Sequence, residues 1–232
     1  MPSTSAIRVA ALALLATSCR PTAPQFAIDP ALASRVPPTT IALAFVDVDQ
    51  LRAAFPKLPA LLGASPNAHA LLIASTGAEF LTITRGADVS LLGPPALIAA
   101  ANTPHSPAAI LATAEPVAAH HPIWIAVRGG TPLPLPGNFA NANNLVTLAD
   151  SLTLTAALHN AVDLELTAQC PTPAAALQFE QRLRALISLT AAAERQPQIA
   201  AALHAIQLRR DDRTVSATLL APAASIQLLL EP

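Results

Sequence analysis

The sequence predicts an α+β fold of two loosely related lobes, each with antiparallel strands and helices packed on one face. Between residues 151 and 169, apolar and polar side chains alternate on both sides of a His159–Asn160 turn. This alternation is typical of an antiparallel hairpin with one wet face. Strand-length apolar runs and segments with helical spacing follow one another along the rest of the chain. The order strand, helix, strand, strand recurs in both halves, which favours antiparallel strands with packed helices.

The first half begins with a nearly continuous apolar strand, "IALAFV", at residues 41–46. Asp47 and Gln50 follow with the spacing of a capping box, so a helix is expected to begin there. "PPALIAAAN" (94–102) predicts a helix with proline in its first turn. Between these two helices, three short strands are expected at 69–75, 79–85 and 88–93.

The second half begins with another apolar strand, "PIWIAVR", at residues 122–128. A loop rich in Gly, Pro and Asn is expected at 129–144, ahead of the hairpin described above. Thr172 and Pro173 have the order of an N-cap and a first helical residue. The remaining expected elements are a hairpin around Asp211–Asp212 and a closing helix at 222–231.

Composition excludes two classes of binding protein. The net charge is -1, so the chain lacks the basic face that a nucleic-acid-binding protein needs. The chain has no tyrosine, and Trp124 is its one tryptophan. Surfaces that bind sugars or single strands use several exposed aromatic rings. We therefore expect neither kind of surface here.

The first nineteen residues have the layout of a secretory signal: Arg8, a short apolar run at 9–16, small residues, and then Cys19. The run is too short to span a bilayer. Small residues directly before a cysteine resemble the lipobox of bacterial lipoproteins. The resemblance implies cleavage before Cys19 and acylation of its sulfur, with palmitate among the acyl chains. The alternative is an ordinary secreted protein in which Cys19 and Cys170 form a disulfide.

Four segments follow from this interpretation. They are a signal peptide at 1–18, a Pro/Ala-rich tether at 19–39, a first α+β lobe at 40–120 and a second at 121–232. The body also resembles, loosely, uncharacterised bacterial envelope lipoproteins. That resemblance rests on "VDVDQLRA", on a helix beginning in "CPTP", and on the "RDDRTV" hairpin, and it transfers no catalytic motif.

Three groups of polar residues were weighed as sites. Asp47 and Asp49 could hold a divalent cation, but a helix cap and a first-turn acid explain them better. His120 and His121 are adjacent on an extended segment and point opposite ways, so a structural loop is favoured over a metal site. Asp211 and Asp212 are expected in a solvated turn, and Cys170 is expected to be a buried, inert thiol.

The sequence thus predicts no catalytic, cofactor-binding or metal-binding residue, and one lipidation site, Cys19. Neither a nucleophile elbow nor a phosphate-cradling glycine loop occurs. The expected protein is non-enzymatic and faces the periplasm or the cell surface. Its lipid anchor holds it to a membrane, it has a binding or structural role, and an envelope protein is a possible partner. The loop from Gly129 to Asn144 is the segment expected to touch that partner. The alternative is an envelope enzyme, hydrolase-like, without a recognisable motif.

Overall fold

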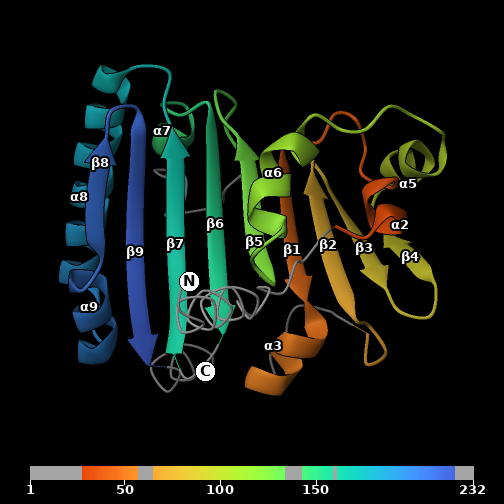
Figure 1. Ribbon diagram of the computed structural model, residues 1–232, viewed down its shortest axis with the longest axis horizontal. Helices are drawn as coiled ribbons and strands as arrows, with labels where there is room; N and C mark the ends of the chain where they lie inside the picture. Colours follow the sequence, from red (N-terminus) through yellow and green to blue (C-terminus); the bar gives the residue numbers. More distant parts are fainter. Residues whose placement is uncertain (1–27, 57–64, 134–142, 159–160, 223–232) are drawn as a thin grey trace, which may run out of the picture.

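A computed structural model describes residues 28–56, 65–133, 143–158 and 161–222. Their strands form one nine-stranded antiparallel sheet in the order β4-β3-β2-β1-β5-β6-β7-β9-β8 (Figure 1). The chain has an α+β fold, as the sequence predicts. The strands are β1 (Ala42–Asp47), β2 (Ala70–Ser75), β3 (Phe80–Arg85), β4 (Val89–Leu92), β5 (Ile123–Arg128), β6 (Ser151–Leu158), β7 (Ala161–Gln169), β8 (Gln207–Asp211) and β9 (Thr214–Pro222).

The described helices divide between the two faces of this sheet. They are α2 (Pro30–Ala33), α3 (Val48–Ala54), α5 (Pro95–Asn102), α6 (Ile110–Ala118), α7 (Asn143–Val146), α8 (Pro173–Ala193) and α9 (Pro197–His204). Helices α2, α5 and α6 bury their apolar side chains against β1, β2, β3 and β5. Helices α7 and α8 pack on the opposite face, against β5, β6, β7 and β9. None of the described helices is both long enough and apolar enough to cross a bilayer.

The two cores follow from the alternation of side chains along the strands. In β5, Trp124 and Ala126 point into the first core, whereas Val127 points into the second. Phe45 of β1 stacks on Trp124 with ring centroids 5.6 Å apart. On the opposite face, Phe179 of α8 is fully buried in the second core. Each half of the chain therefore supplies most of one core, on its own side of the sheet.

The strands of the two expected lobes join without a break. β1 pairs with β5 from Ala42↔Val127 to Val46↔Ile123, and β5 pairs with β6. The body also begins earlier than residue 40, because Leu32 and Val36 are fully buried in the first core. Residues 28–39 therefore belong to the packed body, although the sequence alone placed them in the tether.

Local signals placed most elements correctly. Asp47 caps α3 by accepting a hydrogen bond from the Gln50 backbone N–H at 2.9 Å. Thr172 caps α8 in the same way, by accepting from Ala175 N–H at 3.1 Å. Helix α6 was not predicted from the sequence, because its alanines and the internal Pro116 gave little helical pattern. The closing helix expected at 222–231 lies outside the described residues, except that Pro222 ends β9.

Candidate functional site

The side chains of β6, β7 and β9 that point away from the second core form a polar surface. The pairing register arranges nine of them in three rows across the strands. The rows are Ser151, Gln169 and Thr214; Thr153, Thr167 and Ser216; and Thr155, Glu165 and Thr218. Neighbouring strands lie about 4.8 Å apart, and alternate residues of one strand lie about 7 Å apart. We call these nine residues the polar array.

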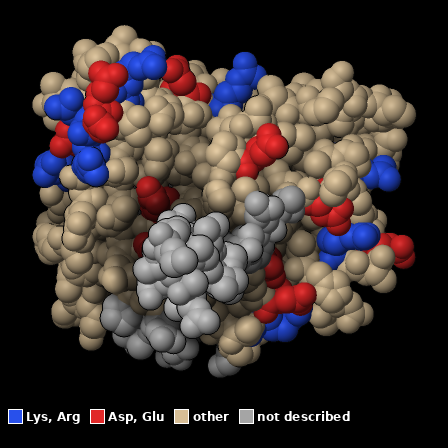
Figure 2. Space-filling model, in the orientation of Figure 1, with Lys and Arg blue, Asp and Glu red and all other residues tan. Residues whose placement is uncertain are grey.

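Beside α6, the polar array is hollowed into a groove of about 390 Å³. We call it the α6–β7 groove, and its lining residues are Ala112, Thr113, Pro116, Val117, His121, Ser151, Thr153, Thr155, Glu165, Thr167 and Gln169. Its floor is polar and belongs to β6 and β7, whereas its wall is mainly apolar and belongs to α6. Figure 2 shows this face of the molecule: basic side chains gather mainly at the upper left, over the ends of β8 and β9.

Thr155 is the most deeply buried polar residue of the floor, with 5% of its surface exposed. Its hydroxyl donates to the backbone carbonyl of Glu165 at 3.5 Å, which is at the outer limit of a hydrogen bond. The oxygen keeps its lone pairs for another donor. A buried hydroxyl with so weak a bond carries a desolvation cost that a molecule in the groove would offset.

Glu165 is the one carboxylate among the described residues that line the groove. Thr167 donates to its Oε1 at 3.5 Å, and no ion pair among the described residues involves it. By contrast, Glu180 of α8 binds both Arg184, at 2.7 Å, and Arg210, at 3.0 Å. The charge of Glu165 is therefore open to a cation that enters the groove.

The wall of the groove depends on the two faces of α6. Ile110, Ala114 and Ala118 are buried in the first core. The residues between them that line the groove lie on the side of the helix near β6 and β7. Pro116 lines the groove and has no N–H to donate to the Ala112 carbonyl one turn earlier. The sequence predicted the wet face of the β6–β7 hairpin. It could not predict the groove, because the opposing wall comes from a helix that the pattern did not reveal.

The structure separates the two adjacent histidines. His121 lines the groove, whereas His120 lies in the turn that follows α6. Among the residues that the structure describes, no cluster of three or more His, Cys, Asp or Glu side chains could hold a metal ion. The groove therefore offers hydrogen bonds, one carboxylate and one imidazole.

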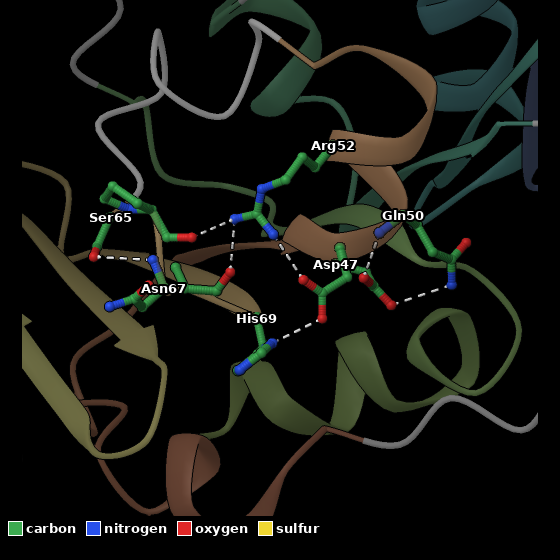
Figure 3. A network of polar contacts seen from close by, with 9 residues as sticks. Asp47, Gln50, Arg52, Ser65, Asn67 and His69 are labelled. Atoms are coloured by element: carbon green, nitrogen blue, oxygen red, sulfur yellow. Dashed lines mark hydrogen bonds and ion pairs between the residues drawn. The ribbon is translucent and has the colours of Figure 1, made fainter.

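Asp47 and Asp49 belong to a separate network at the beginning of α3 (Figure 3). Asp47 is the helix cap, as expected, and Gln50 Nε2 also donates to its Oδ2 at 3.1 Å. Asp49 contacts Arg52 at 2.8 Å and the Nδ1 atom of His69 at 2.9 Å. The hydrogen bond from His69, followed by the charges of His69 and Arg52, holds the pKa of the Asp49 carboxyl below its ordinary value.

The histidine of this network was missed by the sequence analysis, because His69 is twenty residues from Asp49 and lies on another element. The His69 and Asp49 side chains are both more than half exposed. In Figure 3 the nearest labelled hydroxyl, that of Ser65, lies apart from the His69 ring and accepts from Asn67 N–H at 3.4 Å. The pair is thus an exposed hydrogen-bonded contact beside a helix cap.

The remaining candidates are structural. Cys170 is a free cysteine with 2% exposure, and burial raises the pKa of its thiol, as does the charge of Asp150. Asp211 ends β8 and Asp212 lies in the following turn at φ 47°. Cys19, the predicted lipidation site, and most of the loop at 129–144 lie outside the described residues.

Comparisons with known proteins give no relative: no family model, curated protein or solved structure matches this chain. A functional proposal therefore depends on the chemistry of the chain itself. Two features carry it, namely the segment around Cys19 and the α6–β7 groove.

A second hollow of about 700 Å³ lies on the other side of α6, but apart from Glu115 its described lining residues are apolar, including Ile28, Ala108 and Leu111.

Proposed function

We propose that this protein is a lipid-anchored component of the bacterial cell envelope that acts by binding and not by catalysis. The observation that carries the proposal is Cys19, which directly follows an apolar run and two small residues. We further propose that the α6–β7 groove takes part in the binding. Acylation of Cys19 would hold this groove close to a membrane.

The spacing between the cysteine and the folded body supports this arrangement. Ile28 is the first described residue and packs against the first core. It follows Cys19 by nine residues, a length of chain that spans at most about 30 Å. A lipid on Cys19 would therefore keep the body near the bilayer surface.

The lining of the groove supports binding over catalysis. A hydrolytic site is expected to gather a nucleophile, a base and an orienting group within hydrogen-bond reach of one another. The groove has hydroxyls and a single carboxylate, and its imidazole, His121, has no hydrogen bond to either among the described residues. Such a lining suits recognition of a polar molecule.

A hydrolase-like envelope enzyme is the second candidate function, and the contact between His69 and Asp49 favours it. A carboxylate at Nδ1 orients an imidazole so that Nε2 can accept a proton. The pair is exposed and outside the groove, so we rank this function lower. His69→Ala would abolish any hydrolysis of generic ester substrates that depends on this pair, whereas His121→Ala would not.

The test of the proposed function is the fate of Cys19 in full-length protein produced in a bacterial envelope. We expect intact mass to show loss of residues 1–18 and addition of a diacylglyceryl group, with incorporation of labelled palmitate. In a phase-partition experiment, Cys19→Ala should be found in the aqueous phase. Cys170→Ala, the matched control, should be found in the detergent phase like the wild type. Equal partition of wild type and Cys19→Ala would refute the anchor. So would a Cys19–Cys170 disulfide found by non-reducing peptide mapping.

A further inference from the structure

We infer that the α6–β7 groove binds a small aliphatic ammonium compound that also carries a hydroxyl group. The positive nitrogen would contact the Glu165 carboxylate, the hydroxyl would bind the threonine hydroxyls of the polar array, and the hydrocarbon would lie against Pro116 and Val117. The inference deepens the proposed function, because it names the ligand class of the same groove. Three features of the groove lead to it.

The first feature is charge. Glu165 has no cationic partner among the described residues, and neither has Asp163, the next residue on the same face of β7. The basic groups nearest in register belong to other strands. Arg209 of β8 opposes Ser216 in the next row, two strands from β7, and Arg128 of β5 opposes Ser151, two rows from Glu165. Two strand spacings and one row separate Arg209 from Glu165 by roughly 12 Å, and over this and larger distances solvent screens the attraction. An anion would therefore be repelled from the groove and a cation attracted.

The second feature is the hydroxyl floor. Thr153, Thr155 and Thr167 line the groove together and belong to two adjacent rows of the polar array. Among the described residues, the buried Thr155 hydroxyl has one hydrogen bond, the 3.5 Å contact with the Glu165 carbonyl. A ligand hydroxyl can both donate hydrogen bonds to such groups and accept them. A purely apolar ligand would add no hydrogen bond to offset the desolvation cost of the Thr155 hydroxyl.

The third feature is the shape and chemistry of the wall. Ala112, Pro116 and Val117 are small or aliphatic, and the described lining includes no Phe or Trp side chain. A flat aromatic or sugar ring would find no Phe or Trp ring to stack on among these residues, but an alkyl chain would gain apolar contact along α6. The volume, about 390 Å³, is in the range of small-molecule sites.

The test compares three ligands of equal chain length on the protein as purified from a bacterial envelope in detergent, with its acylation determined by mass, and observes the methyl resonances of threonine. Aminopentanol carries the ammonium and the hydroxyl, pentanediol lacks the charge, and hydroxypentanoate reverses it. We expect saturable shifts of Thr153, Thr155 and Thr167 with aminopentanol. Pentanediol should bind about tenfold more weakly, because a charge-assisted hydrogen bond is lost. Hydroxypentanoate should not bind.

Two variants assign the binding to the groove. Glu165→Gln keeps the shape and removes the charge, so it should weaken aminopentanol binding about tenfold and leave pentanediol binding unchanged. Glu79→Gln removes an exposed carboxylate from the β2–β3 turn and is the matched control. Thr155→Val should weaken both ligands without lowering the melting temperature, since the lost hydrogen bond is weak.

The inference is overturned if no saturable shift appears below about 10 mM aminopentanol, or if Glu165→Gln binds as wild type does. Its failure is separable from failure of the anchor. A protein acylated at Cys19 that binds none of the three ligands would keep the anchor and lose the ligand class. Conversely, a protein without acyl chains that binds aminopentanol through Glu165 would keep the ligand class and lose the anchor.

Discussion

At Gly129 the backbone leaves β5 so close to the segment before β6 that no side chain fits. A Cβ atom there would lie 1.7 Å from the Ala149 carbonyl oxygen, and the Gly129 N–H donates to the Asp150 carbonyl at 2.9 Å. Gly130 differs: its φ is +77°, but a Cβ atom would meet nothing within 4 Å. The sequence indicates a loop at this glycine pair. Which of the two is needed for space and which for conformation depends on a contact twenty residues away.

We therefore expect Gly129→Ala to destabilise the fold much more than Gly130→Ala. The first change forces strands β5 and β6 apart and should cost more than about 3 kcal/mol of unfolding free energy. The second places alanine at positive φ in open space and should cost about 1 kcal/mol. Urea unfolding monitored by circular dichroism measures both. Equal losses for the two variants would show that the close approach to Ala149 does not exist.

At the scale of one element, α8 illustrates which contacts a sequence pattern can foresee. The Thr172 cap and the i,i+4 pair of Glu180 with Arg184 lie within one helix, so residue spacing along the sequence indicates both. The second partner of Glu180 is Arg210 of β8, thirty residues later, and the pattern gave no sign of it. Glu180 therefore connects the helix to the edge strand of the sheet.

The hydrogen bond from Arg184, together with that from Arg210, holds the pKa of Glu180 below its ordinary value of 4.5. Because the folded pKa is the lower one, this stabilisation is complete above the ordinary value and is lost as the pH falls through the folded pKa. We expect Glu180→Gln to lower the unfolding free energy by roughly 0.5 kcal/mol at neutral pH and by nothing at strongly acidic pH. Thermal melts across this range test it, with Glu79→Gln, a change at an exposed carboxylate, as control. A loss independent of pH would exclude the ion pairs as its cause.

Across the whole molecule, the pairing of β1 with β5, here called the seam, determines whether the two halves of the chain unfold together. The two cores lie on opposite faces of one sheet, and five register pairs join β1 to β5 across the boundary between the expected lobes. Trp124 is fully buried at this seam, stacked on Phe45. Loss of either core would expose the β1–β5 seam or the strands beside it.

We expect the body to unfold in a single cooperative transition. Trp124 is the one tryptophan of the chain, so its fluorescence reports the seam, whereas far-ultraviolet circular dichroism reports all helices and strands. The two unfolding curves in urea should superimpose. Two separate transitions, with fluorescence tracking only one, would mean that the halves fold as independent lobes. Phe45→Leu should shift both curves together.

Features that depend on neighbouring residues along the chain can be predicted from the sequence. These are the α+β class, the β6–β7 and β8–β9 hairpins, the caps at Asp47 and Thr172, and the buried Cys170. Turn residues, side-chain periodicity and capping act over a few residues, so a single chain displays them.

Only the tertiary structure decided what meets across long separations. It merged the strands of two expected lobes into one sheet, buried Leu32 and Val36 in the first core, and set α6 beside the wet face of β6 and β7. Glu165 and His121 share a groove for that reason alone. The physical cause is that the hydrophobic effect depends on the apolar area buried and not on how far apart the residues lie in the sequence. Packing between distant elements therefore leaves no local sequence pattern.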